Sequence, residues 1–490
     1  MNLETALKPW SLSSQSISSI LEQALNNGGV FSELFFEKAS ATSVLLENGK
    51  LDQVNEGTDR GVGLRVISQG KTYYAYTTEV TEKALLRIAK EISEAIQTSR
   101  LNQNQGNEKK ETLAGQWVQN HSKSKEIESY QVKKSMREVS LPEKVEIAKR
   151  IDQGARGVLP TAVQVTSVVK DALREILVIN SQGEFGAHQK HYFQMIGLVV
   201  GQKNNRLESA HEVVGGFTGQ ELLQSNSPES IGEKAAERVK KLLDAVPAPS
   251  GTLPVVLSSA AGGTMIHEAV GHGLEADLAC NGLSVYQGKL GQKVADTKVS
   301  VVDDGTLPEL RGSYTVDDEG TPSQRNVLIE KGVLKNYMVD RLSALKFDIM
   351  ATGNGRRESF RHKPMVRMTN TFIAPGTDEP EAILASTPKG VFIKSMGGGQ
   401  VNTVSGDFVF SVTEGYLIRD GKLGEAIRGA TLVGNGPKVL QLIDQVGDDL
   451  DFQPGTCGKD GQAAPVTSAQ PTIRIKELTI GGEAPLSDYF

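Results

Sequence analysis

A proline-rich stretch near the middle of the chain places the strongest constraint on its architecture. The segment VPAPSGTLP, from Val246 to Pro254, contains three prolines and one glycine, residues that end helices and strands and are typical of domain boundaries. A chain of 490 residues is too long for one hydrophobic core, so each half is expected to bury its own. We therefore predict an N-terminal domain over residues 1–248 and a C-terminal domain over residues 249–490.

The N-terminal half mixes strand-like and helix-like patterns. Residues 31–78 alternate like paired strands, with a hairpin turn predicted at Asn48-Gly49. The polar residues 99–129 have little apolar periodicity and are predicted to form a surface loop. Further elements are predicted from apolar spacing and capping residues: helices from Thr81 to about Gln97, from Pro142 to about Gln153 behind Ser140, and from about Pro228 to Ala245, and strands at residues 162–169, 176–180 and 191–200.

The C-terminal half is predicted to be rich in β-strands. Short alternating runs, such as residues 407–423 and 472–480, lie between glycine-rich turns. One helix is predicted from Pro437 to about Val446, with proline in its first turn. The whole pattern favours an α+β fold over repeated β-α-β units.

Composition and charge exclude several classes of partner. The formal net charge of −6 provides no basic field of the kind that nucleic-acid binding requires. The apolar stretches are far shorter than the ~20 residues of a membrane span, and the N-terminal residues do not resemble a secretory signal. The two cysteines, Cys280 and Cys457, form no disulfide framework and fit a reducing compartment. We expect a cytoplasmic protein with neither a membrane nor a nucleic-acid partner.

The segment GGTMIHEAVGHGLEAD contains two histidines and a glutamate in an unusual spacing. Zinc peptidases commonly use H-E-x-x-H, but His267 and His272 are five positions apart, with Glu268 after the first. On a regular helix, four positions separate two side chains by roughly 40°, and five by roughly 140°. A π-bulge would absorb the extra residue, and Gly271 and Gly273 beside His272 tolerate backbone distortion. The spacing alone leaves open either a metal site on a distorted helix or a pair of buried histidines.

A catalytic zinc site normally has three protein ligands, so a third ligand is needed. The candidates are Glu275, one of the remaining histidines, or a cysteine. Cys457 lies in PGTCGKDGQ, which is predicted to be a glycine-rich turn. Cys457 is either a thiolate ligand, which would suit a soft metal, or a small residue buried for packing. Cys280 follows an apolar helix end and is expected to pack.

HEAVGHGLEAD together with GTCGKDGQAAPVTSAQPTIRI resembles the TldD/PmbA peptidase family, specifically its metal-bearing TldD branch. The similarity runs nearly end to end and includes ENGKLDQVNEGTDRGVGLRV, LIEKGVLKNYMVDR and SMGGGQVNTVSGDFVFSVTEGYLI. The resemblance implies zinc ligands at His267, His272 and Cys457, and a catalytic glutamate at Glu268. It also implies a peptidase of extended or unfolded peptides that pairs with a PmbA/TldE-type paralogous subunit in a heterodimer or higher oligomer.

Zinc would activate a water and polarise the peptide carbonyl, and Glu268 would move the proton to the leaving amine. The group that stabilises the oxyanion is not identified. A tyrosine, an arginine or His362 in RRESFRHKPMVR are candidates, although that basic cluster is expected to be a solvated or interface surface. The segment SMGGGQVNTVSG, residues 395–406, either receives an extended peptide as an edge strand does or forms a tight turn.

Two functions of other classes remain as alternatives. A non-catalytic interaction protein, of the DNA gyrase modulator type historically assigned to this family, would not need Glu268 beside a ligand, and structural zinc sites usually have four protein ligands. An oxidoreductase with Cys457 as redox thiol would lack both a C-x-x-C pair and a cofactor motif.

Overall fold

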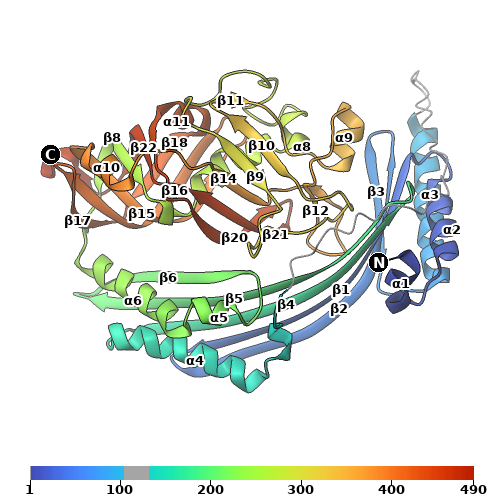
Figure 1. Cartoon of the computed structure of the whole chain (residues 1–490), viewed down its shortest axis with the longest axis horizontal. Helices are drawn as coiled ribbons and strands as arrows, with labels where there is room; N and C mark the ends of the chain where they lie inside the picture. The colour runs from blue at the N-terminus through green and yellow to red at the C-terminus, as the bar shows by residue number, and fades with distance from the viewer. Residues whose placement is uncertain (1, 104–131) are drawn as a thin grey trace.

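A long, curved antiparallel sheet organises the N-terminal half of the computed structural model, which describes residues 2–103 and 132–490 (Figure 1). Asn48 and Gly49 have φ of 51° and 72° and form the predicted hairpin turn. The strand order is β3-β2-β1-β4-β5-β6, and the strands are β1 Phe31–Glu47, β2 Lys50–Ser68, β3 Lys71–Thr77, β4 Gln164–Asn180, β5 Phe185–Lys203 and β6 Arg206–Phe217.

Two of the predicted strands are one continuous strand. Residues 164–169 of the first predicted strand and residues 176–180 belong to β4, whose polar centre interrupts the apolar pattern. Asp171 in that centre accepts from Lys144 Nζ at 2.5 Å, and Arg174 Nε donates to Glu37 at 2.6 Å. The strand continues because ion pairs compensate its buried polar residues. The last strand, β6, was not predicted.

Helices cover the outer parts of this sheet. The predicted helices are present, but two are longer than predicted: α3 extends to Gln103 and α4 to Val158. The predicted loop over residues 99–129 is therefore wrong for residues 99–103, and its residues 104–129 lie outside the described residues. The helices and 3₁₀ turns are α1 Leu3–Leu7, η1 Lys8–Trp10, α2 Ser14–Leu25, α3 Glu82–Gln103, η2 Met136–Glu138, α4 Leu141–Val158, α5 Leu222–Ser225 and α6 Pro228–Asp244.

Local capping explains where these helices begin. The Thr81 hydroxyl accepts from the Ala84 N–H at 3.2 Å at the start of α3. Ser140 and Glu143 form a reciprocal capping box at the start of α4. No described helix combines the length and the apolar character needed to cross a membrane.

The C-terminal half contains two larger sheets. One has the order β15-β8-β22-β18-β16-β17-β7, and the additional pairing of β15 with β16 closes part of it into a barrel. The strands of this sheet are β7 Val246–Pro247, β8 Pro249–Leu257, β15 Lys389–Val401, β16 Asp407–Arg419, β17 Lys422–Arg428, β18 Thr431–Asn435, β19 Ile443–Val446, β22 Ile473–Gly481 and β23 Ala484–Pro485.

The second sheet has the order β11-β10-β9-β14-β21-β20 and carries Cys457. The helix predicted from Pro437 to Val446 ends at Leu442, because residues 443–446 pair with β22 as strand β19. The remaining elements are β9 Val301–Asp304, β10 Arg325–Glu330, β11 Val333–Leu334, β12 Gly355–Arg356, β13 Met365–Val366, β14 Asn370–Ile373, β20 Asp451–Lys459, β21 Gln462–Gln470, η3 Ser259–Ala261, α8 Ala276–Ala279, α9 Arg341–Phe347, α10 Pro380–Ala385, α11 Gly436–Leu442 and η6 Leu486–Asp488.

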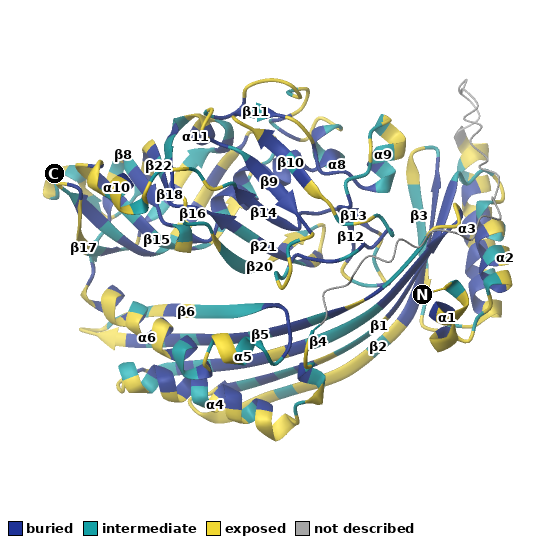
Figure 2. Cartoon of the chain, in the orientation of Figure 1, coloured by how far each residue is buried: buried dark blue, intermediate teal, exposed yellow. Residues whose placement is uncertain are grey.

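Buried residues form the centres of both halves, and residues on the outward faces of the helices are exposed (Figure 2). The two halves meet through buried ion pairs. Arg357 bonds Glu33, and Lys190 Nζ lies 3.0 Å from Asp318. Residues 356–367 were expected to be a solvated or interface surface. They are not solvated at Arg356, Arg357 and Arg367, which are buried because carboxylates or backbone carbonyls accept their hydrogen bonds. Arg357 lies at the contact between the two halves.

Candidate metal centre

The histidine motif is distorted where its spacing requires distortion. The helical turn α7 (Thr264–Ile266) is followed by a π-helical turn, η4 (His267–Gly271), and a 3₁₀ turn, η5 (His272–Leu274). The His272 N–H donates to the His267 carbonyl, five residues earlier, which is the hydrogen bond of a π-helix. The extra residue is therefore absorbed between the two histidines.

The glycines beside His272 are needed for packing. Gly271 has helical backbone angles, with φ of −55°. A Cβ there would lie 2.0 Å from Met368 Sδ, and a Cβ at Gly273 would lie 2.7 Å from the Tyr286 ring. Close approach of neighbouring side chains, rather than unusual backbone angles, therefore explains these two glycines.

The fold brings the three predicted ligand residues together. Each of His267, His272 and Cys457 offers one ligand atom, and these atoms lie within 4.8 Å of one another. Cys457 Sγ is 3.3 Å from His272 Nε2, and the two imidazole rings are 5.2 Å apart at 85°. All three residues are buried. Cys457 lies within strand β20 rather than on a turn, because the hairpin turn comes at Asp460-Gly461, with φ of 48° and 74°.

Charge and hydrogen bonding at this group favour a thiolate. Burial raises the pKa of the Cys457 thiol, but hydrogen bonds from His267 and His272 outweigh burial and bring that pKa down to about 4. Burial lowers the pKa of His272, but the Glu275 carboxylate and Cys457 outweigh it and raise that pKa well above its ordinary value. Cys457 and His272 therefore resemble a thiolate–imidazolium pair. A metal cation that bound there would replace the proton of the imidazolium.

Glu275 supports His272 from behind. Its Oε2 lies 3.0 Å from His272 Nδ1 and 3.0 Å from Lys459 Nζ. Lys459 also bonds both carboxylate oxygens of Asp277, at 2.8 and 2.6 Å. The candidate ligand Glu275 is therefore placed as the hydrogen-bond partner of a histidine, as carboxylates commonly are around metal-binding histidines.

The pKa values of these carboxylates differ sharply. Burial raises the pKa of Glu275, but Lys459 and His272 outweigh it and hold the pKa at about 2. Burial raises the pKa of Asp277 to about 6, against the opposing effect of Lys459. Lys459 and Asp277 were not predicted as site residues, although both lie within the two motifs, because sequence spacing does not reveal a contact across 182 positions.

The donor set fits a zinc ion. Two imidazole nitrogens and a thiolate are ligands that zinc accepts, and three protein ligands leave one position for water. The Nδ1 atom of His267 is buried and has no hydrogen-bond partner among the described residues. A metal or a water would supply the partner that this atom lacks.

Glu268 is more exposed than the three candidate ligand residues. Its side chain is 24% exposed and its Oε2 is 4.0 Å from His272 Nε2. With His267 it lines a cavity of about 840 Å³ between the two halves of the chain. The walls of this cavity include residues 394–399 of β15, residues 451 and 453–456 of β20, and parts of β6 and α6.

The glycine-rich segment 395–406 begins as a strand. Gly397, Gly398 and Gly399 lie in β15, and the fourth glycine, Gly406, lies beyond its end with φ of 82°. β8 pairs with β15 only over Val391–Ile393. A Cβ at Gly397 or Gly399 would contact side chains of β16 closely, whereas a Cβ at Gly398 would meet no atom within 4 Å. Gly398 therefore faces open space in the cavity that Glu268 lines.

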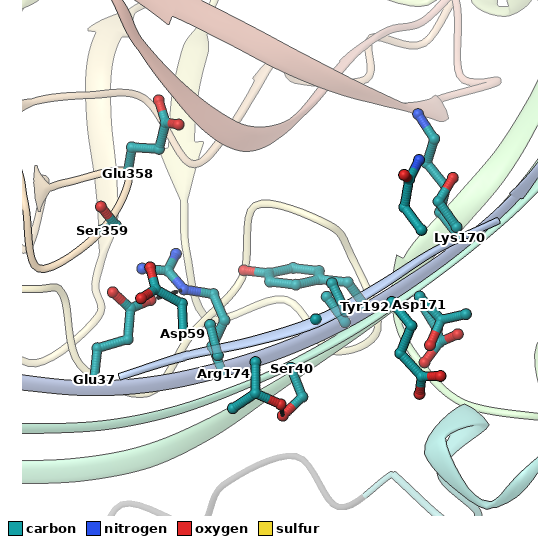
Figure 3. Close-up of a pocket in the computed structure, with 18 of the residues that line it drawn as sticks. Glu37, Ser40, Asp59, Lys170, Asp171, Arg174, Tyr192, Glu358 and Ser359 are labelled. Atoms are coloured by element: carbon teal, nitrogen blue, oxygen red, sulfur yellow. Dashed lines mark hydrogen bonds and ion pairs between the residues drawn. The ribbon is translucent and has the colours of Figure 1, made fainter. Parts of the chain in front are cut away.

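A second cavity, of about 930 Å³, lies on the inner face of the long sheet (Figure 3). Arg174 and Tyr192 of the sheet face Glu358 and Ser359 of the C-terminal half across it. His362 lines this second cavity and not the one that Glu268 lines. The other cysteine, Cys280, packs against the C-terminal core as predicted.

A buried His-His-Cys group with a glutamate that opens into a cavity is the arrangement of a metallopeptidase. The chain matches three family profiles, described as PmbA/TldA metallopeptidase domain 1 over residues 32–99, the central domain over residues 134–243, and the C-terminal domain over residues 250–482. The chain belongs to the TldD/PmbA family of metallopeptidases.

Relatives span nearly the whole chain. The metalloprotease TldD homolog of Haemophilus influenzae is 35% identical over 98% of both chains, and a metalloprotease of Methanothermobacter thermautotrophicus is 31% identical over 90% of this chain and 93% of its own. Two solved structures share the fold. The TldE of Thermococcus kodakarensis has a TM-score of 0.74 at 19% identity, covering 95% of this chain and 100% of its own. A Thermotoga maritima protein labelled as a modulator of DNA gyrase has a TM-score of 0.76 at 23% identity, covering 95% and 99%.

Proposed function

We propose that this chain is a zinc-dependent peptidase that hydrolyses extended or unfolded peptides. The observation that carries the proposal is the meeting of His267, His272 and Cys457 in one buried group beside the cavity-lining Glu268. When bound there, zinc would polarise the scissile carbonyl and lower the pKa of a water to about 7.

The side chains of the site have separate roles in this proposal. His267, His272 and Cys457 hold the metal, and Glu275 keeps a proton on His272 Nδ1, so that Nε2 is free to bind. Glu268 accepts a proton from the attacking water and delivers it to the leaving amine. Its partial exposure to the cavity suits this role, since the carboxylate must reach both water and substrate.

The cavity favours an extended peptide as substrate. Beyond Ile393, β15 continues along the cavity wall without a β8 partner, so its edge is available to an added strand. The open space at Gly398 allows a peptide backbone to approach closely. A folded protein would not enter a cavity of about 840 Å³.

We further propose that the chain acts with a PmbA/TldE-type subunit in a heterodimer or higher oligomer. A solved protein named TldE shares this fold, which supports a paired assembly of two related chains. The division into domains at residues 1–248 and 249–490 is part of the proposal. The profile boundaries at residues 243 and 250 support a division near residue 248, and two further profiles share residues 32–243. A cytoplasmic location is supported by two unpaired cysteines, one of them the proposed ligand.

The alternative of a non-catalytic interaction protein is less favoured. The gyrase-modulator label describes the T. maritima protein, whose likeness to this chain shows the fold alone. A regulator has no need for a carboxylate between a metal group and a cavity, which is where Glu268 lies.

Elemental analysis of the purified protein tests the metal site. About one zinc per wild-type chain is expected, and most of it should be lost in Cys457→Ser. Cys280→Ser is the matched control, because it removes the other free thiol, which lies outside the site. Unfolded peptides should then be cleaved by the wild type and not by Glu268→Ala. A metal-free wild type would contradict the proposal. So would a zinc-loaded enzyme that cleaves no peptide, whether or not the paralogous subunit is present.

A further inference from the structure

A group of cationic side chains lines one wall of the cavity that contains the candidate metal centre. Lys241 Nζ and Arg238 Nε, on α6, lie 3.1 and 3.2 Å from the carboxylate of Glu414 on β16. Lys394 Nζ, on β15, lies 3.3 Å from the same carboxylate. Glu414 is 4% exposed at its side chain, and Tyr416 also donates to it, at 2.6 Å.

Positive charge exceeds negative charge in this group. Arg238 is shared between Glu414 and Glu212, so three cations face two carboxylates. Lys234 and Glu237, which line the same wall, add one charge of each sign. One positive charge is therefore left over on this wall, while the carboxylates of Glu268 and Asp451 line other parts of the same cavity.

The two lysines are available to a ligand. The side chains of Lys241 and Lys394 are 43% and 44% exposed, and both line the cavity. An ammonium has three N–H donors, so a bond to Glu414 leaves donors for another acceptor. A carboxylate is the acceptor that a positive excess and free N–H donors select.

The position of Lys394 relates this group to the path of the peptide. Lys394 directly precedes the cavity-lining segment Ser395–Gly399 on β15, where β8 no longer pairs. A peptide bound along that edge would bring one of its carboxylates close to Lys394 and Lys241, while its backbone runs through the same cavity, which Glu268 also lines.

Resting on the proposed peptidase function, we propose that Lys394 and Lys241 bind a carboxylate of the peptide substrate and so determine specificity. The carboxylate is either the C-terminus of the peptide or an acidic side chain. Both lysines act in binding and not in the reaction, so their loss should raise KM and leave kcat nearly unchanged.

The test compares three fluorescent peptides of one sequence. The first has a free C-terminus and one glutamate, the second has an amidated C-terminus, and the third has glutamine in place of the glutamate. Each is titrated against zinc-loaded Glu268→Ala protein by fluorescence anisotropy, and cleavage by the wild-type enzyme is measured in parallel.

Lys394→Gln and Lys241→Gln should each weaken binding of the first peptide about tenfold, because each removes a charge-assisted hydrogen bond. The same fall should follow from removing the recognised carboxylate, by amidation if it is the C-terminus or by glutamine if it is the side chain. Against that neutralised peptide, the lysine variants should bind like the parent protein. Lys240→Gln is the matched control, because Lys240 lies on α6 but does not line the cavity.

Equal binding of all three peptides, or an equal loss in the lysine variants for charged and neutralised peptides, would overturn the inference. The anisotropy measurement separates this result from failure of the proposed function. A protein that cleaves peptides without a carboxylate preference would retain the proposed function and lose this inference. A protein that binds peptides with the predicted preference but cleaves none would lose only the proposed function.

Discussion

Replacement of Glu275 tests whether the metal centre depends on a carboxylate behind His272. Glu275 is fully buried, and its Oε2 contacts both His272 Nδ1 and Lys459 Nζ at 3.0 Å. Its other oxygen, Oε1, is buried without a hydrogen-bond partner among the described residues. Glu275→Gln can therefore keep an acceptor oxygen at the Oε2 position and place its NH₂ group at the Oε1 position, with little change of shape.

The magnitude follows from what each variant removes. Loss of a carboxylate partner of a metal-binding histidine typically weakens metal binding about 10–100-fold, or about 1.4–2.8 kcal/mol. Glu275→Gln keeps the hydrogen bond to His272 and loses only the charge, so we expect about tenfold. Glu275→Ala loses the hydrogen bond as well, so we expect about 100-fold. Lys459 stays paired with Asp277 in both variants.

Zinc affinity is measured by competition with a chromophoric chelator, and circular dichroism checks that each variant is folded. Cys280→Ser serves again as the control with an intact site. Affinities unchanged from the wild type in both variants would refute the supporting role of Glu275. Loss of zinc in Glu275→Ala as complete as in Cys457→Ser would instead make Glu275 a ligand.

Three further predictions test the cavity and the contact between the halves. Gly398→Val should raise KM for unfolded peptides several-fold without lowering the melting temperature, because the added side chain enters the open cavity. Gly399→Val should destabilise the fold, since its Cβ would lie 1.8 Å from Phe410. Equal effects of the two variants on KM and on the melting temperature would contradict this prediction. Arg357→Met should cost about 3–5 kcal/mol of unfolding free energy, measured with urea, because it leaves buried Glu33 without its nearest cation; an unchanged midpoint would be the contrary result. Burial raises the pKa of Glu414, but Tyr416, Lys394 and Lys241 outweigh it and hold the pKa at about 2 instead of 4.5. The stability that Glu414 contributes is therefore present above pH 4.5 and should be lost as the pH falls toward 2. A stability difference between the wild type and Glu414→Gln that stays constant over this pH range would disprove this prediction.

Local sequence rules worked where the determining interactions are local. The Asn48-Gly49 turn and the helix starts at Thr81 and Ser140 appear as predicted, because their hydrogen bonds join residues a few positions apart. The spacing of His267 and His272 left open a distorted helix or a pair of buried histidines, and the structure has the distorted helix, with a π-helical turn between them.

The same rules failed where distant residues decide. The polar centre of β4 remains a strand because Lys144 and Glu37 pair with its charged residues, and neither is near in sequence. Arg357 and Arg367 are buried because their acceptors, Glu33 and the Cys457 and Gln462 carbonyls, come from distant segments.

The sequence by itself determined the chemistry available to this protein: two imidazoles, a thiolate and a carboxylate in motifs shared with a peptidase family. Only the tertiary structure decided the arrangement of these groups. It places Cys457 in a strand, with its Sγ 3.3 Å from His272 Nε2. It also places Glu275 as the hydrogen-bond partner of His272, and His362 in the lining of another cavity. The physical reason is that a ligand set drawn from positions 185 residues apart is assembled by the packing of sheets against one another, which no local pattern encodes.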